Sequence, residues 1–230
     1  MDPVLEQLKA GVRWFRREVY PERAEVFAQA ATTPQRPHTL FITCADSRID
    51  PIEITSSGTG EVFVTRNIGN LVPTYGQMMG SMSAVLEFAV GALGVKHVVV
   101  CGHSDCGAMK ALLAPESTAK MPAVSNWLKN AQEALWEAKR AHEAAVARGG
   151  IVRSLVDELT EINVLLQIAH LKTHPSVRDA MARGELTVSG WIYDIGSGRV
   201  SIAEDGETRF RPVETRKQDD SMVRLAYREL

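Results

Sequence analysis

The amino-acid sequence predicts an α/β fold with a Rossmann-like, parallel-rich central sheet, flanking helices and an N-terminal helical arm. Three short segments are apolar and rich in β-branched and aromatic residues, as strands buried on both faces of a parallel sheet are. They are residues 39–44, 61–66 and 97–102. Between the second and third, residues 80–94 carry apolar side chains at helical spacing, so strand, helix and strand follow one another as in a right-handed parallel unit.

The predicted arm precedes the first strand. Apolar side chains over residues 4–20 fall near one face of a helix, and two prolines within residues 32–37 interrupt the helical pattern. An apolar face of this kind needs a surface to cover it. The residues that form the face are Val4, Leu5, Leu8, Val12, Phe15 and Val19.

The later segments extend the same architecture. Helices are expected over residues 107–113, about 121–148 and 151–173, with an Arg-Gly-Gly break between the last two. Residues 186–195 alternate like a strand, and a Gly-Ser-Gly turn leads from them into a further strand over 199–204. No change in composition marks a second domain.

The composition of the chain excludes several classes of protein. The 230 residues are 45% apolar, which is enough to fill a core, and the net charge of −2 gives no basic excess for nucleic acid. No apolar stretch reaches the ~20 residues of a membrane helix, and the N-terminus lacks the pattern of a signal peptide. Three cysteines are a poor disulfide framework. A cytoplasmic location is therefore expected, where thiols are more often metal ligands or catalysts.

Two thiols and an imidazole occur where predicted strands end. Cys44 closes the first strand, and His103 and Cys106 follow the third. Ligands in open α/β sheets bind beyond the carboxyl ends of parallel strands, so these side chains meet if the two strands are neighbours. Two thiolates and one imidazole are a common zinc set that leaves a fourth, catalytic position open. The alternative is an ordinary loop with a buried cysteine and a surface histidine.

A carboxylate and a guanidinium follow Cys44. Asp46 and Arg48 are two residues apart, so both side chains can project to one side of an extended segment. Beside a metal, the carboxylate could accept a hydrogen bond from bound water while the arginine keeps it ionised. On an open surface, the same pair would be an ion pair of little energetic worth. Cys101 lies inside the apolar strand and is interpreted as a small buried hydrophobe.

Four motifs, in this order along the chain, resemble those of the β-class carbonic anhydrases. They are CADSR at 44–48, RNIGN at 66–70, GHSDCG at 102–107 and GWIYDI at 190–195.

The resemblance covers most of the chain and implies a single domain. It would consist of an N-terminal helical arm (1–34), a zinc-binding α/β core (35–205) and a C-terminal extension (206–230).

The resemblance also implies the roles of the site residues. One zinc ion per subunit would be held by Cys44, His103 and Cys106. Asp46 and Arg48 would form a carboxylate–guanidinium pair beside a zinc-bound hydroxide. Gly107 matches the position whose backbone N–H, at a helix start, can meet the bound anion.

A substrate pocket is implied at four further positions. Gln35 stands where plant-type members carry a glutamine that can donate a hydrogen bond to substrate. Phe63, Ile68 and Phe88 match positions that line an apolar pocket for carbon dioxide. A tyrosine is common where Phe88 stands, so a hydroxyl is lost there. Without the resemblance, all of these residues except Gln35 would be interpreted as ordinary core.

The resemblance bears on regulation and assembly as well. Members that are regulated by bicarbonate carry a tryptophan three residues before the first cysteine ligand, and this chain has Phe41 there. The plant-type, non-regulated form is therefore expected, with Asp46 paired to Arg48 rather than bound to zinc. In the family the N-terminal helix lies across a neighbouring subunit, which implies a homodimer or a dimer of dimers.

The implied activity is the reversible hydration of carbon dioxide to bicarbonate and a proton. One alternative is hydrolysis of carbon disulfide or carbonyl sulfide by the same zinc chemistry. Another is a zinc-binding regulatory protein without turnover, which predicts a closed site with four ligands. A nucleotide-binding protein is disfavoured because the chain has neither G-x-G-x-x-G nor a phosphate-binding loop.

Overall fold

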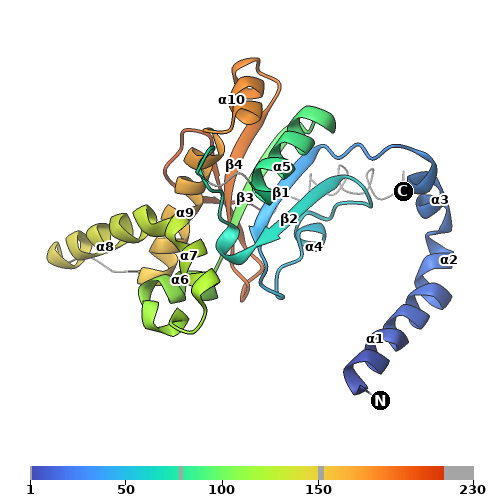
Figure 1. Ribbon diagram of the computed structural model, residues 1–230, viewed down its shortest axis with the longest axis horizontal. Helices are drawn as coiled ribbons and strands as arrows, with labels where there is room; N and C mark the ends of the chain where they lie inside the picture. Colours follow the sequence, from blue (N-terminus) through green and yellow to red (C-terminus); the bar gives the residue numbers. More distant parts are fainter. Residues whose placement is uncertain (1, 78–79, 150–152, 215–230) are drawn as a thin grey trace.

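The computed structural model describes residues 2–77, 80–149 and 153–214, and these residues form a sheet of six strands with helices on its faces (Figure 1). The strand order is β2-β1-β3-β4-β5-β6. The first four strands in this order are parallel, and β5 and β6 add to the sheet antiparallel. The predicted parallel-rich sheet is therefore confirmed. The strands are β1 (Thr39–Cys44), β2 (Val62–Asn67), β3 (His97–His103), β4 (Thr187–Tyr193), β5 (Val200–Glu204) and β6 (Arg211–Pro212).

Side chains alternate between the two faces of the sheet, as the pleat of a strand requires. Leu40 and Ile42 of β1 lie in a large core cluster with Val98 and Val100 of β3. Phe41, between them in sequence, points to the other face, where it packs against Trp191 with ring centroids 5.6 Å apart. The strands are thus apolar on both faces, which is the pattern from which they were predicted.

Helices cover the face of the sheet that carries the larger cluster. The side chains that close this cluster come from α5 (Ser81–Leu86), its π-helical continuation η3 (Glu87–Ala92), α9 (Leu155–Leu171) and α10 (Pro175–Ala182). Helix α10 was not predicted. Pro175 is the first residue of α10, a position where the missing N–H of proline breaks no helical hydrogen bond. Because proline favours such a helix start, α10 begins there as a helix separate from α9, which ends at Leu171.

A second core cluster lies beyond the carboxyl end of β3. It is built by α6 (Gly107–Leu113), α7 (Pro122–Leu128), α8 (Gln132–Ala147) and α9. Cys44 and Cys106 belong to it. The predicted helix over 121–148 is interrupted by a short 3-10 turn, η5, and α8 projects from the body of the molecule (Figure 1). The 3-10 turns between these helices are η4 (Pro115–Thr118) and η5 (Lys129–Ala131).

The N-terminal arm stands away from the sheet (Figure 1). Helix α1 has no buried residue, and the side chains of Leu8, Val12 and Trp14 are 65%, 59% and 57% exposed. The arm is longer than the predicted helix, because a π-helical turn and two further helices follow α1. Its elements are α1 (Pro3–Trp14), η1 (Phe15–Val19), α2 (Tyr20–Glu22) and α3 (Ala24–Thr32).

Two short helical elements adjoin β2 in the chain: α4 lies between β1 and β2, and η2 follows β2. Helix α4 (Pro51–Thr55) begins at Asp50, whose carboxylate accepts hydrogen bonds from the N–H groups of Ile52 and Glu53. The 3-10 turn η2 (Ile68–Asn70) follows β2 directly. Within the described ranges, no helix has the length and apolar character needed to cross a membrane.

Two glycines allow α9 to lie close against the sheet. A Cβ atom added at Gly190 of β4 would stand 2.7 Å from Val164 Cγ1, and one added at Gly102 of β3 would stand 2.8 Å from Val164 Cγ2. Both distances are shorter than a real Cβ contact, so no larger residue fits without movement of α9.

We expect Gly190→Ala to lower the free energy of unfolding by about 1–3 kcal/mol, the usual cost of overpacking a core. Gly91→Ala is the matched control, because a Cβ at Gly91 meets no atom within 4 Å. That change should leave stability unchanged or raise it by about 0.5–1 kcal/mol, since alanine is the better helix former. Urea denaturation of both variants is the measurement, and equal stabilities would contradict the close packing of α9.

Candidate metal centre

Three potential metal ligands meet at the carboxyl end of the sheet. Cys44 is the last residue of β1, His103 is the last residue of β3, and Cys106 precedes α6. Their ligand atoms all lie within 4.8 Å of one another, and all three residues are buried. They meet because β1 and β3 are adjacent, with Thr43 in register with Cys101. His103 is still part of the strand, one residue beyond the predicted end.

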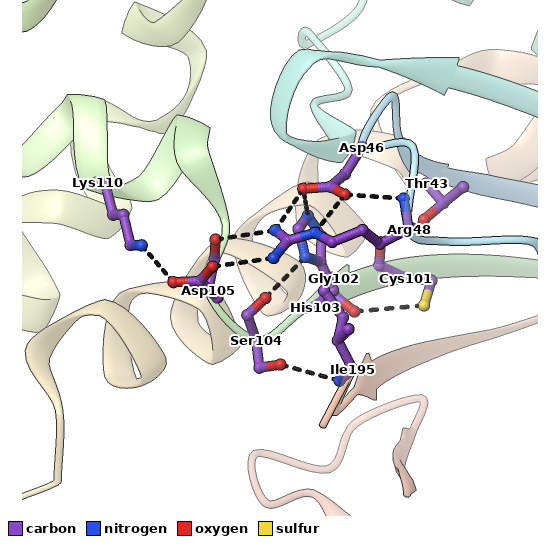
Figure 2. Close-up of polar contacts among 10 residues, drawn as sticks. All are labelled: Thr43, Asp46, Arg48, Cys101, Gly102, His103, Ser104, Asp105, Lys110 and Ile195. Carbon is purple, nitrogen blue, oxygen red and sulfur yellow. Dashed lines mark hydrogen bonds and ion pairs between the residues drawn. The ribbon is translucent and has the colours of Figure 1, made fainter. Parts of the chain in front are cut away.

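The imidazole of His103 is arranged as a metal ligand would be. Its Nδ1 lies 2.8 Å from the carbonyl oxygen of Ser104, so this nitrogen carries the proton and donates it (Figure 2). In the neutral imidazole, Nε2 is then the acceptor nitrogen, and it is buried without a hydrogen-bond partner among the described residues. A buried polar atom without a partner is costly, whereas a metal ion would satisfy it. The donor set of two thiols and one imidazole therefore fits zinc.

The two thiols influence each other strongly. The pKa of Cys44 lies well below its usual value, chiefly because the Cys106 thiol donates a hydrogen bond to its sulfur and also because of the N–H groups of Gly69 and Asp46. The pKa of Cys106 is raised well above its usual value by its contact with Cys44 and by burial. A site that stabilises one thiolate before any cation arrives is prepared for a cation, since thiolates are the binding form.

The third cysteine of the chain stays outside this group. Cys101 is fully buried within β3, and burial raises the pKa of its thiol to about 12. It is therefore a neutral, inert thiol at physiological pH, as interpreted from the apolar strand around it.

Asp46 and Arg48 form a two-pronged ion pair beside the ligands. Arg48 donates from Nε to Asp46 Oδ1 at 2.9 Å and from Nη2 to Oδ2 at 2.8 Å, and its backbone N–H adds a third bond to Oδ1 at 3.0 Å. These bonds hold the pKa of Asp46 well below its usual range. Asp46 Oδ2 also lies 4.0 Å from His103 Nε2, so an ionised carboxylate faces the ligand group.

Asp105 is a site residue that the sequence analysis missed. Its carboxylate accepts a hydrogen bond from Arg48 Nη1 at 3.0 Å and a second bond from Lys110 of α6 (Figure 2). In the sequence it is only one residue of the GHSDCG motif, and nothing in the spacing signals that it faces Arg48.

A chain of buried amides, also missed, fixes the turn η2 against α9. Gln167 accepts from the N–H of Val72 at 2.7 Å and donates to Asn163 Oδ1 at 2.9 Å, and Asn163 donates to the carbonyl of Gly69 at 3.2 Å. Since the N–H of Gly69 faces the Cys44 sulfur, α9 helps to hold this N–H in place. The available signal was two amide residues within the otherwise apolar run of α9.

Ile68 and Gly107 lie at the same end of the sheet as Cys44, His103 and Cys106. Ile68 follows Asn67, which is in register with Cys44, and its carbonyl accepts a hydrogen bond from Trp127 Nε1 at 2.8 Å. Gly107 begins α6 directly after Cys106, and a Cβ there would meet nothing within 4 Å. The space beside the Gly107 Cα is therefore open.

Gln35, Phe63 and Phe88 are not brought to the ligand group within one chain. Phe63 is in register with Leu40, four residues before Cys44, which is about 13 Å along the strand. Phe88 packs against Phe63 with ring centroids 6.0 Å apart. Gln35 precedes β1 altogether, and it shares with Phe88 the wall of a cavity near the start of that strand. These three residues belong to the opposite end of the sheet.

A buried cysteine–histidine–cysteine group at the carboxyl edge of a parallel sheet defines the class as a metal-binding α/β protein. Comparison with known proteins agrees with this class. A family model described as carbonic anhydrase matches residues 39–200. A carbonic anhydrase of Pseudomonas aeruginosa is 45% identical over 196 residues, which cover 85% of this chain and 86% of that protein.

Solved structures are similar as well. The β-carbonic anhydrase CcaA superimposes with a TM-score of 0.82 at 35% identity, covering 94% of each chain. One of two tetrameric β-carbonic anhydrases from the filamentous ascomycete Sordaria macrospora gives a TM-score of 0.75 at 30% identity, covering 90% of this chain and 98% of that one.

The chain belongs to the β-class carbonic anhydrases. It is a carbonate dehydratase, which interconverts carbon dioxide and bicarbonate, and its cysteine–histidine–cysteine group is suited to bind zinc.

We expect Cys44→Ser to lose zinc, because a hydroxyl is a harder and more weakly acidic ligand than a thiol. The loss in affinity should exceed the roughly 10–100-fold that removal of an outer hydrogen-bond partner costs. Cys101→Ala is the matched control, since Cys101 is buried in the neighbouring strand but is not part of the group, and it should retain zinc. Metal analysis after gel filtration, with stopped-flow hydration on the same samples, is the measurement. Full zinc and normal turnover in Cys44→Ser would remove this residue from the site.

Proposed function

We propose that each chain holds one zinc ion through Cys44, His103 and Cys106, and that Asp46 and Arg48 are the catalytic pair for hydration of carbon dioxide. The observation that carries the proposal is the convergence of three buried ligand atoms, one of them the unpartnered Nε2 of His103. Zinc bound there would supply the Lewis acidity that makes water a nucleophile near neutral pH.

The proposed task of Asp46 follows from its ionised state. A carboxylate without a proton can only accept hydrogen bonds, so Asp46 can accept one from the attacking water and direct a lone pair of that oxygen toward the substrate carbon. Oδ2 is the oxygen that faces the ligand group, 4.0 Å from His103 Nε2. Arg48 keeps the carboxylate charged and fixes its rotation through two parallel hydrogen bonds.

Substrate binding, in our proposal, uses residues of two subunits. Gly107 lies at the open start of α6, where its N–H can approach a product anion, and Ile68 contributes an apolar side chain. Gln35, Phe63 and Phe88 lie at the opposite end of the sheet, so they can line the carbon dioxide pocket only from a second copy of the chain.

A homodimer or a dimer of dimers is supported by two apolar surfaces that are open in the single chain. One is the exposed face of α1. The other is the face of the sheet opposite α9, where the partly exposed Val62 and Trp191 line a cavity of about 350 Å³. Surfaces of this kind mark contacts between proteins. The Sordaria macrospora enzymes are described as tetrameric.

The finer assignment is the plant-type, non-regulated form. Phe41 stands three residues before Cys44 and has no polar atom with which to bind an anion, and Asp46 is engaged by Arg48. We also propose that the chain is one domain, with a 1–34 arm, a 35–205 core and a 206–230 extension. A cytoplasmic location is supported by three cysteines that are all free of disulfides.

The two other readings of the site have no observation in their favour. A regulatory zinc protein would close the site with a fourth ligand, and the group found among the described residues has three. Carbon disulfide and carbonyl sulfide would use the same zinc chemistry, whereas the relatives named above are carbonic anhydrases.

We expect Asp46→Asn to keep zinc and to lower turnover on the order of 100-fold, because an amide cannot replace the charged acceptor. Asp50→Asn is the control: it makes the same chemical change at a helix cap, where asparagine serves equally well. The measurements are the zinc content and the stopped-flow rate of carbon dioxide hydration of both variants and the wild type. Wild-type turnover of fully loaded Asp46→Asn would exclude Asp46 from the reaction.

For assembly, we expect light scattering to report a dimer or tetramer for the wild type. Replacing Leu8 and Val12 together by Asp should weaken the association, because both side chains lie on the exposed apolar face of α1. Ala10→Asp changes the opposite face of the same helix and should leave the mass unchanged. A wild-type mass of one chain at all concentrations would refute the shared pocket.

A further inference from the structure

Arg48 makes a contact that the catalytic pair does not require. Its Nε and Nη2 atoms serve Asp46, while Nη1, on the other side of the guanidinium, donates to Asp105 Oδ2 at 3.0 Å. Figure 2 shows the guanidinium between the two carboxylates. The N–H groups of a guanidinium point in fixed directions in one plane. Those on one side bond Asp46 and one on the other side bonds Asp105, so the group is held from both sides.

The need for a second contact follows from the exposure of Arg48. Its side chain is 45% exposed, whereas that of Asp46 is 17% exposed. A long side chain in contact with water has many alternative rotamers, so a single ion pair holds it weakly. If Arg48 turned away, Asp46 would lose the two bonds that fix its rotation.

Asp105 is well placed to restrain Arg48. Its backbone is left-handed, with φ of 60°, and it lies between the ligand positions His103 and Cys106. Lys110, one turn into α6, bonds the other carboxylate oxygen, Oδ1. The Asp105 side chain is itself 54% exposed, so its left-handed backbone and its bond to Lys110 are what limit the positions of the carboxylate that Arg48 meets.

We propose that Asp105 is a positioning residue that holds Arg48 in place and, through Arg48, orients the Asp46 carboxylate toward the ligand group. The proposal rests on the proposed catalytic role of Asp46 and Arg48. The side chain of Asp105 bonds Arg48 and Lys110, so its effect on the reaction is expected to pass through Arg48.

A double-mutant cycle tests this path. Asp105→Asn removes the charge and keeps the left-handed backbone, which asparagine tolerates. At matched zinc content, it should lower kcat/KM about 3- to 10-fold, which lies in the lower part of the range of coupling between residues in contact. In the Asp46→Asn background, the same substitution should have no further effect. An equal loss in both backgrounds would overturn the proposal, because the carboxylate would then act independently of Asp46.

A second measurement does not depend on turnover. The Nε–H of Arg48 is hydrogen-bonded to Asp46. Its NMR signal can be followed in the zinc-loaded protein and assigned by its disappearance in Arg48→Lys. Its exchange with water should become several-fold faster in Asp105→Asn, because exchange reports local opening. Unchanged exchange would overturn the proposal even if turnover fell.

The controls separate positioning from folding and from net charge. Asp105→Gly accepts the left-handed backbone without strain and should reproduce the losses of Asp105→Asn. Asp205→Asn removes a carboxylate paired with Lys172, far along the chain, and should change neither readout. If Asp46→Asn alone left turnover unchanged, the catalytic pair would fail, while the exchange measurement would still decide whether Asp105 holds Arg48.

Discussion

The adjacency of β1 and β3 is the constraint on which the site depends. Cys44 and His103 are 59 positions apart in the chain, and only the parallel pairing of these strands brings their side chains together. The pairing is stabilised mainly by burial, because Leu40, Ile42, Val98 and Val100 enter one core beneath α5 and α9. The polar groups of the site contribute little to stability by comparison. Their positions are set by the apolar core, and the chemistry occurs at its edge.

Much of the fold could be predicted from the sequence because its signals are local. The apolar runs of β1, β2 and β3, and the helical spacing between the last two, are visible in single segments. The boundaries of α7, α8 and α10 were less predictable, since short turns and prolines divide stretches that look uniformly helical. The helical arm itself was predicted, and its helices end at Thr32, where the first of the two prolines within 32–37 follows.

The convergence of Cys44, His103 and Cys106 and the pairing of Asp46 with Arg48 could be predicted because strand ends and short motifs mark these residues, although the adjacency of the strands had to be assumed. The groups that support them were not accessible. Asp105 faces Arg48 across 57 residues, and Asn163 reaches Gly69 across 94. Such contacts depend on the packing of α6 and α9 against the sheet, which no pattern in one segment encodes. Gln35, Phe63 and Phe88, at the far end of the sheet, show a related limit, since one chain does not bring them to the cysteine–histidine–cysteine group.

The two glycines beneath α9 have a consequence for how this sequence can change. Val164 occupies the volume that side chains at Gly102 and Gly190 would need, so the three positions share one space. A larger residue at either glycine requires either a smaller side chain at Val164 or movement of α9, and the same helix carries the amides that reach Gly69. Substitutions at Gly102 or Gly190 are therefore expected to occur together with compensating substitutions at Val164. A redesign that increases the distance between α9 and the sheet must likewise change strand and helix residues together.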